Sequence, residues 1–492
     1  DLLEMHSGHG NSEEYRSWRA STVTRESEVV VDTMINVRDV TELDFQTGTL
    51  IATVDGTERS IDFGTQTCPK PSDNYTPQCW KLGEIIYERC IEAGVNKQEC
   101  EARKIKTQQI VVDRGRTGIN AVSNLSERDK LDSGQCRDCF SPAMNYVPGG
   151  SAQYGMALTK FNDDGSKHRF KYGFISSSDN HQAAPGSGYK ELFHTSVDGV
   201  GPQTELFDKF LHMEPYTIGA ENFNPVKDAY ISDDQPIDFD LTKLNLGFNS
   251  IEWERQRSFF QTGGLAAVHS EGRSKEEIWN AFKRHETYAT SGPRILLWFD
   301  LVNNENRPDG KSPMGSLVEM NNNPEFEVRA MGSYIQKSGC PEDAYVALGE
   351  DRVNELCYNE CYNPTDERKK ITRIEIIRVW PQEYVNQPID DRIEDTWLVH
   401  NCDTDSIGCK FTFTDPDFTA MQSDVSYYAR AIEEPSPIIN VKGAHCIYDE
   451  EGNCSEFKIC TQDWKNPRDL EACTSIDEPR AWSSPIYLNF KS

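Results

Sequence analysis

The sequence predicts an α/β protein followed by a β-sandwich-like C-terminal domain. In the first 293 residues, apolar side chains recur at helical spacing from Leu82 to Ile91, and the apolar strand expected at Tyr172–Ile175 ends in a polar cluster. Beyond residue 294, short segments in which apolar and polar residues alternate are separated by turn signals. We therefore expect one domain over residues 1–293 and a second over residues 294–492.

The N-terminal domain is expected to contain strands, helices and two cysteine-rich insertions. Val29–Val31 and Leu50–Val54 are apolar enough to form strands. Residues 66–112 are bounded by cysteines and contain two helical stretches, the second beginning near Cys100. Residues 113–168 are polar and rich in turn signals.

The remaining elements follow in chain order. Residues 196–250 have few periodic features and indicate an extended insertion. A strand is expected in FFQTGGLAAVHSEG, and Ser274 with Glu277 predicts a capping box for the helix EEIWNAFKRHETY. The strands expected in the C-terminal domain are ILLWFDLV, FEVRAMG, ITRIEIIRVW, CKFTFTD and VSYYARAIE.

The charge and hydropathy of the chain exclude several kinds of partner. Its 51 Lys and Arg residues against 80 Asp and Glu residues give a net charge of -29, which repels nucleic acid and anionic lipid. No run of apolar residues is long enough for a membrane-spanning helix. The expected partner is a small-molecule substrate.

The 15 cysteines indicate an oxidising compartment, periplasmic or extracellular, because many occur in close pairs across the chain. The spacing does not determine which cysteines pair. The C-x-x-C motif at residues 136–139 has no second such motif and no histidine pair nearby, which favours a structural disulfide over zinc or redox chemistry. Cys340, Cys357 and Cys361 are interpreted in the same way. The disulfide candidates are Cys68, Cys79, Cys90, Cys100, Cys136, Cys139, Cys402, Cys409, Cys446, Cys454, Cys460 and Cys473.

The sequence begins without an initiator Met or a signal peptide, as the end of a strand that runs directly into a polar motif. A secreted protein needs an export signal, so we expect a segment upstream of Asp1. The odd number of cysteines allows either a partner in that segment or one free thiol.

The strongest candidate site is the pair Asp179 and His181, directly after the strand expected at Tyr172–Ile175. Alternate residues at a strand end project to the same side, so both side chains can bind one metal ion. A carboxylate beside an imidazole suits Zn, Mn or Fe. The alternative is that Asp179 caps a turn and His181 is a surface residue.

A second cluster lies at the N-terminus, where Glu4, His6, His9 and Glu13 fall within ten residues. Glycines on both sides of His9 allow the backbone to approach a ligand closely. The cluster can supply part of a metal site, although a hydrolytic site needs at least three protein ligands and an open position for water. A solvated polar turn is the alternative.

Arg294 follows a Gly-containing turn and is a candidate for binding an anionic group of the substrate. Given the surplus of acidic residues, it could equally pair with a surface carboxylate.

Five segments occur together in an order that resembles a known family. They are HGNSEEYRSW, GEIIYERC, KYGFISSSDNHQAAPG, GGLAAV with EEIWNAFKRHETYATSGPRI, and PRAWSSPIY. The chain resembles, over most of its length, a bacterial family catalogued as a domain of unknown function and placed in the PHP (polymerase and histidinol phosphatase) superfamily.

This resemblance implies a distorted TIM-like (PHP-type) barrel with a metal cluster at the C-terminal ends of its strands. About two or three divalent transition metals, Zn, Mn or Fe, would activate water there if the opening metal-binding motif of the superfamily is present upstream of this sequence. Asp179 and His181 match the D-x-H metal motif, His9 matches the histidine of HGNSE, and Glu4 and His6 are further candidate ligands. The opening H-x-H motif of the superfamily is expected upstream of Asp1, so the barrel would lack its N-terminal strands. Its own N-terminal fragment and a homo-oligomer are therefore candidate partners.

The resemblance and the residues together favour a secreted metal-dependent hydrolase, phosphoesterase-like, in which Asp179 and His181 are catalytic and Arg294 binds substrate. The net charge makes a neutral ester or amide substrate a second possibility. The alternative function is a non-catalytic extracellular binding or structural protein on a degenerate PHP barrel. A thiol redox protein is disfavoured, because the C-x-x-C motif lies in a loop-rich region.

Overall fold

The computed structural model describes nearly two thirds of the chain. The residues described are 1–7, 10–16, 22–23, 40–44, 49–54, 57–62, 66–115, 133–134, 139–140, 151–178, 263–357, 361–403, 406–439, 445–451, 454–458 and 474–491. The strands expected at Val29–Val31 and the insertion expected at residues 196–250 lie outside them.

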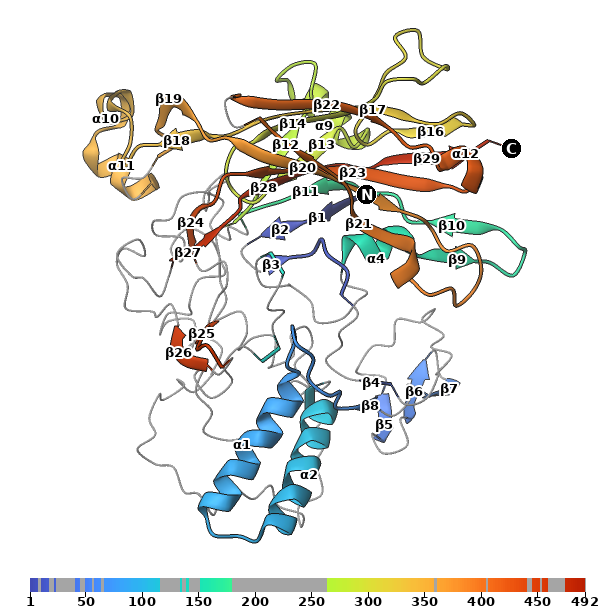
Figure 1. The fold of residues 1–492 in the computed structure, drawn as a ribbon, viewed down its shortest axis with the longest axis vertical. Coiled ribbons are helices and arrows are strands. Elements are labelled where there is room, and N and C mark those ends of the chain that lie inside the picture. The colour runs from blue at the N-terminus through green and yellow to red at the C-terminus, as the bar shows by residue number, and fades with distance from the viewer. Residues whose placement is uncertain are drawn as a thin grey trace.

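An eight-stranded sheet forms the centre of the molecule (Figure 1). Its strands come from distant parts of the sequence, and neighbours are antiparallel except for one parallel pair, β16 with β29. In spatial order they are β12 (Leu265–Val268), β13 (Thr287–Thr290), β28 (Arg480–Ser483), β23 (Val425–Glu433), β20 (Ile371–Val379) and β21 (Ile393–Asn401), with β29 (Ile486–Phe490) joining β16 (Leu317–Met320) to β23. Strands on both sides of residue 293 share this sheet, and the division of the chain there stays a prediction.

A four-stranded sheet packs on one face of the central sheet. It contains β15 (Ser312–Pro313), β14 (Leu296–Leu301), β17 (Glu325–Met331) and β22 (Gly408–Thr414). Alternate residues of β14 and β17 are buried, as the period of two along a strand requires. Phe299 and Phe326 stack at 5.3 Å, and Phe326 contacts Tyr427 of β23.

The N-terminal segment covers the opposite face. It contains β1 (Leu2–Glu4), β2 (His6–Ser7), β3 (Gly10–Asn11), α4 (Ala152–Ala157), β9 (Thr159–Phe161), β10 (Lys167–Arg169) and β11 (Gly173–Ile175). Phe174 and Met5 pack there against Tyr428 and Trp482. Because both faces of the central sheet are covered, all nine residues of β23 are buried.

The expectation of an α/β fold with a distorted TIM-like barrel is wrong. Such a barrel alternates parallel strands with helices around a closed sheet. In the described part of the chain, strands predominate over helices, and the end strands of the central sheet, β12 and β21, do not pair with each other. A short apolar strand that ends in a polar cluster has the same sequence pattern in a barrel and in the parallel β1–β11 pair seen here.

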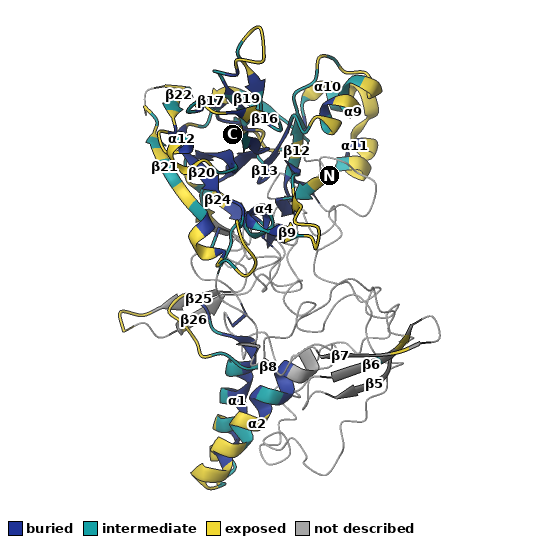
Figure 2. Ribbon diagram, turned by 90° about the vertical axis from the view of Figure 1, so that its right-hand side faces the viewer, coloured by how far each residue is buried: buried dark blue, intermediate teal, exposed yellow. Residues whose placement is uncertain are grey.

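A helical hairpin extends from the rest of the molecule, formed by α1 (Gln78–Glu92) and α2 (Lys97–Gly115) (Figure 1). Its helices were expected from the apolar spacing. Leu82 and Ile86 of α1 are buried against Val111 and Val112 of α2. The turn between the helices is exposed (Figure 2).

The other elements are short. They are β4 (Thr22–Val23), β5 (Val40–Asp44), β6 (Thr49–Val54), β7 (Thr57–Asp62), β8 (Gln66–Thr67), α9 (Lys275–Lys283), β18 (Tyr334–Gln336), α10 (Glu342–Leu348), α11 (Glu350–Cys357), β19 (Pro364–Arg368), the 3-10 turn η5 (Asp390–Arg392), α12 (Phe418–Met421), β24 (Ser436–Ile439), β25 (His445–Tyr448), β26 (Cys454–Lys458) and β27 (Thr474–Asp477). The capping box predicted at Ser274 and Glu277 is confirmed at the start of α9. The expected strand Leu50–Val54 is confirmed as β6.

Four disulfides are described: Cys68–Cys79, Cys90–Cys100, Cys340–Cys361 and Cys402–Cys409. Three of them join close pairs identified in the sequence, and two brace the base and the tip of the α1–α2 hairpin. Cys139 is also disulfide-bonded. The structural disulfide expected for Cys357 is wrong, because Cys357 is a free thiol. The side chains of Cys136, Cys446, Cys454, Cys460 and Cys473 lie outside the description. Among the helices that are described, none is long and apolar enough to cross a membrane.

Candidate functional site

The ends of β1, β2, β11, β12, β13 and β28 meet at one edge of the fold, which we call the strand-end edge. It consists of Glu4 and His6, Ser176–Ser178, Gly263–Gly264, Ser291, and Arg480. Because β1 and β11 are parallel, their carboxyl ends point the same way, and Glu4 lies opposite Ile175.

Ser177 ties the first two strands together at this edge. Its hydroxyl donates to a carboxylate oxygen of Glu4, and its backbone N–H donates to the His6 carbonyl at 3.1 Å. The candidate ligand Glu4 is therefore half-buried and held by the residue that lies two positions before Asp179.

Gly263 and Gly264 pack tightly onto the same edge. The Gly264 N–H donates to the Ser177 carbonyl at 2.6 Å. A Cβ on Gly264 would lie 2.4 Å from the Cβ of Ser176 and 2.8 Å from the His6 carbonyl oxygen, closer than side chains tolerate. The Gly-Gly pair is thus explained by close backbone approach, as expected for glycine beside a crowded strand end.

His6 is buried in an aromatic cluster. Its ring centroid lies 5.9 Å from that of Phe140 and 6.1 Å from that of Trp482, with the Trp482 ring stacked. Burial, together with the nearby positive charge of Arg480, lowers the pKa of His6 to about 3. The imidazole is therefore neutral at physiological pH, which is the form that binds metals.

Glu13 has a structural role below the edge. It is completely buried, and Oε1 accepts from the Tyr428 hydroxyl at 2.7 Å and from Nε of Arg430 at 2.9 Å. Oε2 accepts from the indole N–H of Trp482. Arg430 also binds Glu375 and Asp395. Glu13 therefore fastens the N-terminal segment to β23 and β28.

Glu14, next in sequence, has a strongly perturbed carboxyl group. Burial and the neighbouring Glu13 charge raise the pKa of Glu14 to about 7. Arg16 opposes this shift and binds the Glu14 carboxylate at 2.8 Å.

Arg480 is the first residue of β28 and joins the edge through its backbone. Its N–H donates to the Ser291 hydroxyl at 2.9 Å, and its carbonyl accepts from the Ser291 N–H at 2.9 Å. Its guanidinium lies 3.8 Å from the centre of the Phe140 ring, the same ring that packs beside His6. Burial and the repulsion of Arg430 lower the pKa of Arg480.

Three of the predicted ligands, His9, Asp179 and His181, lie outside the described residues, as does their geometry. Their sequence neighbours are described: Ser7 pairs with Gly10 on either side of His9, and Ser178 precedes Asp179. No group of three or more His, Cys, Asp or Glu side chains that could hold a metal occurs within the described part of the chain. Glu4 and His6 are the predicted ligands that the description does place at the edge.

Arg294, the predicted substrate-binding residue, is exposed, and its guanidinium lies 3.8 Å from the centre of the Tyr362 ring. This stacking stabilises a cation at the surface. Binding of an anionic group by Arg294 stays a prediction.

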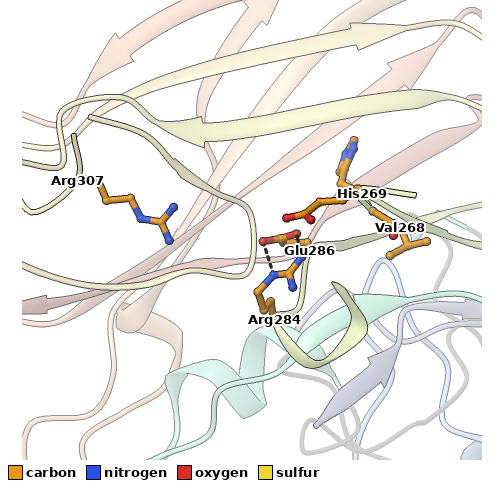
Figure 3. Close-up of a pocket in the computed structure, with 7 residues that line it drawn as sticks. Val268, His269, Arg284, Glu286 and Arg307 are labelled. Atoms are coloured by element: carbon orange, nitrogen blue, oxygen red, sulfur yellow. Dashed lines mark hydrogen bonds and ion pairs between the residues drawn. The ribbon is translucent and has the colours of Figure 1, made fainter. Parts of the chain in front are cut away.

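A separate hollow of about 600 Å³ lies at the other end of β12 (Figure 3). His269, Arg284, Glu286 and Arg307 are among its lining residues. The guanidinium of Arg284 makes two hydrogen bonds to the Glu286 carboxylate, at 2.9 and 2.8 Å, and His269 Nε2 lies 2.8 Å from the Leu297 carbonyl oxygen. Arg284 and Glu286 thus neutralise each other in this hollow, and Arg307 stands apart from them (Figure 3).

Sequence reasoning missed Arg480 and Glu14. Arg480 belongs to the segment PRAWSSPIY, which contributed to the family resemblance. It lies 476 residues after Glu4 in the sequence, and no local pattern shows that its side chain will be buried at the same edge as Glu4. Glu14 stands in the HGNSEE motif and was read only as part of that motif.

A family model described as a protein of unknown function (DUF3604) matches residues 140–330. No curated protein and no solved structure matches the chain. The matched range includes Asp179, His181, Gly264 and Arg294. The expected resemblance to a family of unknown function is thereby supported over this range, and nothing in the comparisons links the chain to the PHP superfamily.

Proposed function

We propose that the protein is a metal-dependent hydrolase, phosphoesterase-like, that uses a metal-activated water. His9, Asp179 and His181 are the proposed ligands, and Glu4 is a further ligand. The assignment to the PHP superfamily is part of this proposal and rests on the sequence motifs.

One observation supports the proposal most directly. Ser177, two residues before Asp179, is hydrogen-bonded both to the Glu4 side chain and to the His6 carbonyl, three residues before His9. Described residues close in sequence to the proposed ligands therefore lie together at the same edge. Imidazole and carboxylate donors together suit Zn, Mn or Fe, and a divalent ion held there would lower the pKa of a bound water and polarise the scissile ester.

The protein's own groups would then complete the site. Glu4 is fixed by Ser177, so its carboxylate is held at the edge before any ligand arrives. His6 is held neutral between aromatic rings. The crowded Gly263–Gly264 backbone leaves no room for a side chain that would displace these groups.

The test compares metal content and turnover of chromogenic phosphate monoesters and diesters in the wild type, Asp179→Ala and His181→Ala. Asp163→Ala is the matched control, because Asp163 is exposed in a turn. Each ligand variant is expected to lose bound metal and at least about 100-fold in kcat. If both ligand variants keep full metal content and turnover, the assignment is wrong.

We further propose a periplasmic or extracellular location, since the described disulfides require an oxidising compartment to persist. The proposed substrate is a small molecule.

A second candidate function is an extracellular binding protein. It is favoured by the α1–α2 hairpin, which is braced by two disulfides and has exposed apolar residues, Ile91 and Ile105, on its outer surface. The same assay separates the two functions, because a binding protein would show no turnover that depends on Asp179.

A further inference from the structure

Arg480 is almost entirely buried at the strand-end edge, with 7% of its surface exposed. Its Nε donates to the Glu478 carbonyl at 3.3 Å, and the flat face of the guanidinium rests on Phe140. Within the described structure, no carboxylate or carbonyl accepts a hydrogen bond from either of its two terminal amino groups.

Two other buried arginines of the central sheet form ion pairs with carboxylates. Arg430, 2% exposed, binds Glu13, Glu375 and Asp395. Arg378, 5% exposed, binds three carboxylates in the same manner. Arg480 is thus as buried as these side chains, yet it lacks their ion pairs.

The acidic groups nearest to Arg480 are already engaged. Glu13, Glu14 and Asp477 all contribute favourable electrostatic interactions to Arg480, but none forms an ion pair with it in the described structure. Asp477 accepts from the Glu478 N–H at 2.8 Å. The oxygens of Glu13 accept from Arg430, Tyr428 and Trp482, as described above. Glu14 binds Arg16, and its raised pKa reduces its negative charge near neutral pH.

A buried charge without a partner costs free energy, so its retention needs a reason outside the stability of the fold. The planar guanidinium presents parallel N–H groups that match a phosphate or carboxylate group and bind it through two hydrogen bonds. The position also suits a substrate, because Phe140 contacts both Arg480 and His6.

We propose that Arg480 binds an oxyanion of the substrate, a phosphoryl or carboxylate group, at the strand-end edge. The inference rests on the proposed hydrolase function for the identity of the ligand as a substrate. It assigns anion binding to Arg480 in place of the surface residue Arg294.

The experiment is a calorimetric titration of the full chain with inorganic phosphate and, separately, with acetate. Chelator-treated protein is used, so that the anion cannot bind to a metal. The variants are Arg480→Met, which removes the charge, and Arg480→Lys, which keeps the charge but lacks the parallel N–H groups of the guanidinium. Arg352→Met is the matched control, because Arg352 is exposed on α11 and pairs with Glu355. Circular dichroism together with tryptophan fluorescence verifies that each variant is folded.

The wild type and Arg352→Met are expected to bind one of the two anions with equal affinity. Arg480→Met should bind at least about 10-fold more weakly, and Arg480→Lys should lie between them. Preference for phosphate or for acetate identifies the oxyanion. The inference would be overturned if folded Arg480→Met or Arg480→Lys bound the anion as tightly as the wild type. It would also be overturned if the wild type bound neither anion.

Failure of the hydrolase proposal gives a different result. Metal content and turnover are measured on untreated samples of the same variants. If anion binding depends on Arg480 but the protein has no metal and no turnover, the anion site is supported and the hydrolase proposal is wrong. If the protein has metal and turnover but anion binding does not depend on Arg480, the hydrolase proposal is supported and the anion site is wrong.

Discussion

Replacing Glu13 by Ala should destabilise the fold more than any substitution of a surface carboxylate. Glu13 is completely buried and accepts hydrogen bonds from Tyr428, Trp482 and two nitrogens of Arg430. Without it, the Trp482 N–H and part of the Arg430 guanidinium are left without acceptors. Breaking a buried ion pair from one side costs about 3–5 kcal/mol, and each orphaned buried donor costs about 1–3 kcal/mol, so the two estimates agree.

The estimate is reduced by the partners that remain. Glu375 and Asp395 still bind Arg430 at 2.6 and 2.8 Å, so its charge stays compensated. We therefore expect a loss of about 3 kcal/mol in the free energy of unfolding, toward the lower end of the range. The matched control is Glu327→Ala, whose partner Lys410 is exposed, and it should cost less than about 1 kcal/mol.

The assay is equilibrium unfolding in guanidinium chloride without reductant, followed by tryptophan fluorescence. Trp482 is itself a direct reporter, because its indole N–H binds Glu13. A loss in Glu13→Ala no larger than that in Glu327→Ala would refute the conclusion that Glu13 fastens the N-terminal segment to the central sheet.

Three further predictions concern packing, disulfides and pH. Gly264→Ala places a methyl group 2.4 Å from the Cβ of Ser176, so thermal unfolding should show a loss of about 1–3 kcal/mol, and wild-type stability would contradict the crowding. Replacing both Cys90 and Cys100 by Ser opens a loop with a sequence separation of 10 residues. The loss should cost about 3 kcal/mol of local stability and speed proteolysis within the α1–α2 hairpin. An unchanged cleavage rate would show that this disulfide does not stabilise the hairpin. Glu14 has a folded-state pKa of about 7, above the ordinary value of 4.5, so its contribution to stability is fully present below pH 4.5 and is lost as the pH rises through 7. Between pH 5 and pH 8, the free energy of unfolding should therefore fall less in Glu14→Gln than in the wild type. An identical fall in the two proteins would contradict the raised pKa of Glu14.

The sequence was sufficient for many individual elements, because their signals are local. The segments around Phe299, Phe326, Ile376 and Tyr428 alternate or are continuously apolar, and each forms a strand as expected. The capping box at the start of α9 is likewise fixed by a few neighbouring residues. Three disulfides join cysteines that are close in sequence, but their spacing alone left the pairing open.

The arrangement of those strands could not be predicted, because strand pairing is not local. β13 pairs with β28 across about 190 residues of sequence, and nothing in Thr287–Thr290 specifies Arg480–Ser483 as its neighbour. The barrel expectation failed for the same reason: a motif at the end of β11 resembles a barrel strand, but the partner of β11 decides the fold.

The candidate site divides in the same way. Glu4 and His6 were found from their position in one motif, and the structure places both at the strand-end edge. The roles of Glu13 and Arg480 depend on contacts with β23, β28 and Phe140, which lie far away in the sequence.

The most direct test of the central claim is the transition-metal content of the protein, purified without chelators, in the wild type and in Asp179→Ala. If the protein from its native source carries the expected upstream H-x-H segment, we predict about two or three equivalents of Zn, Mn or Fe per wild-type chain, and a loss of metal in Asp179→Ala. Metal-free wild-type protein, or equal metal content in the two proteins, would contradict the proposal of a metal-dependent hydrolase.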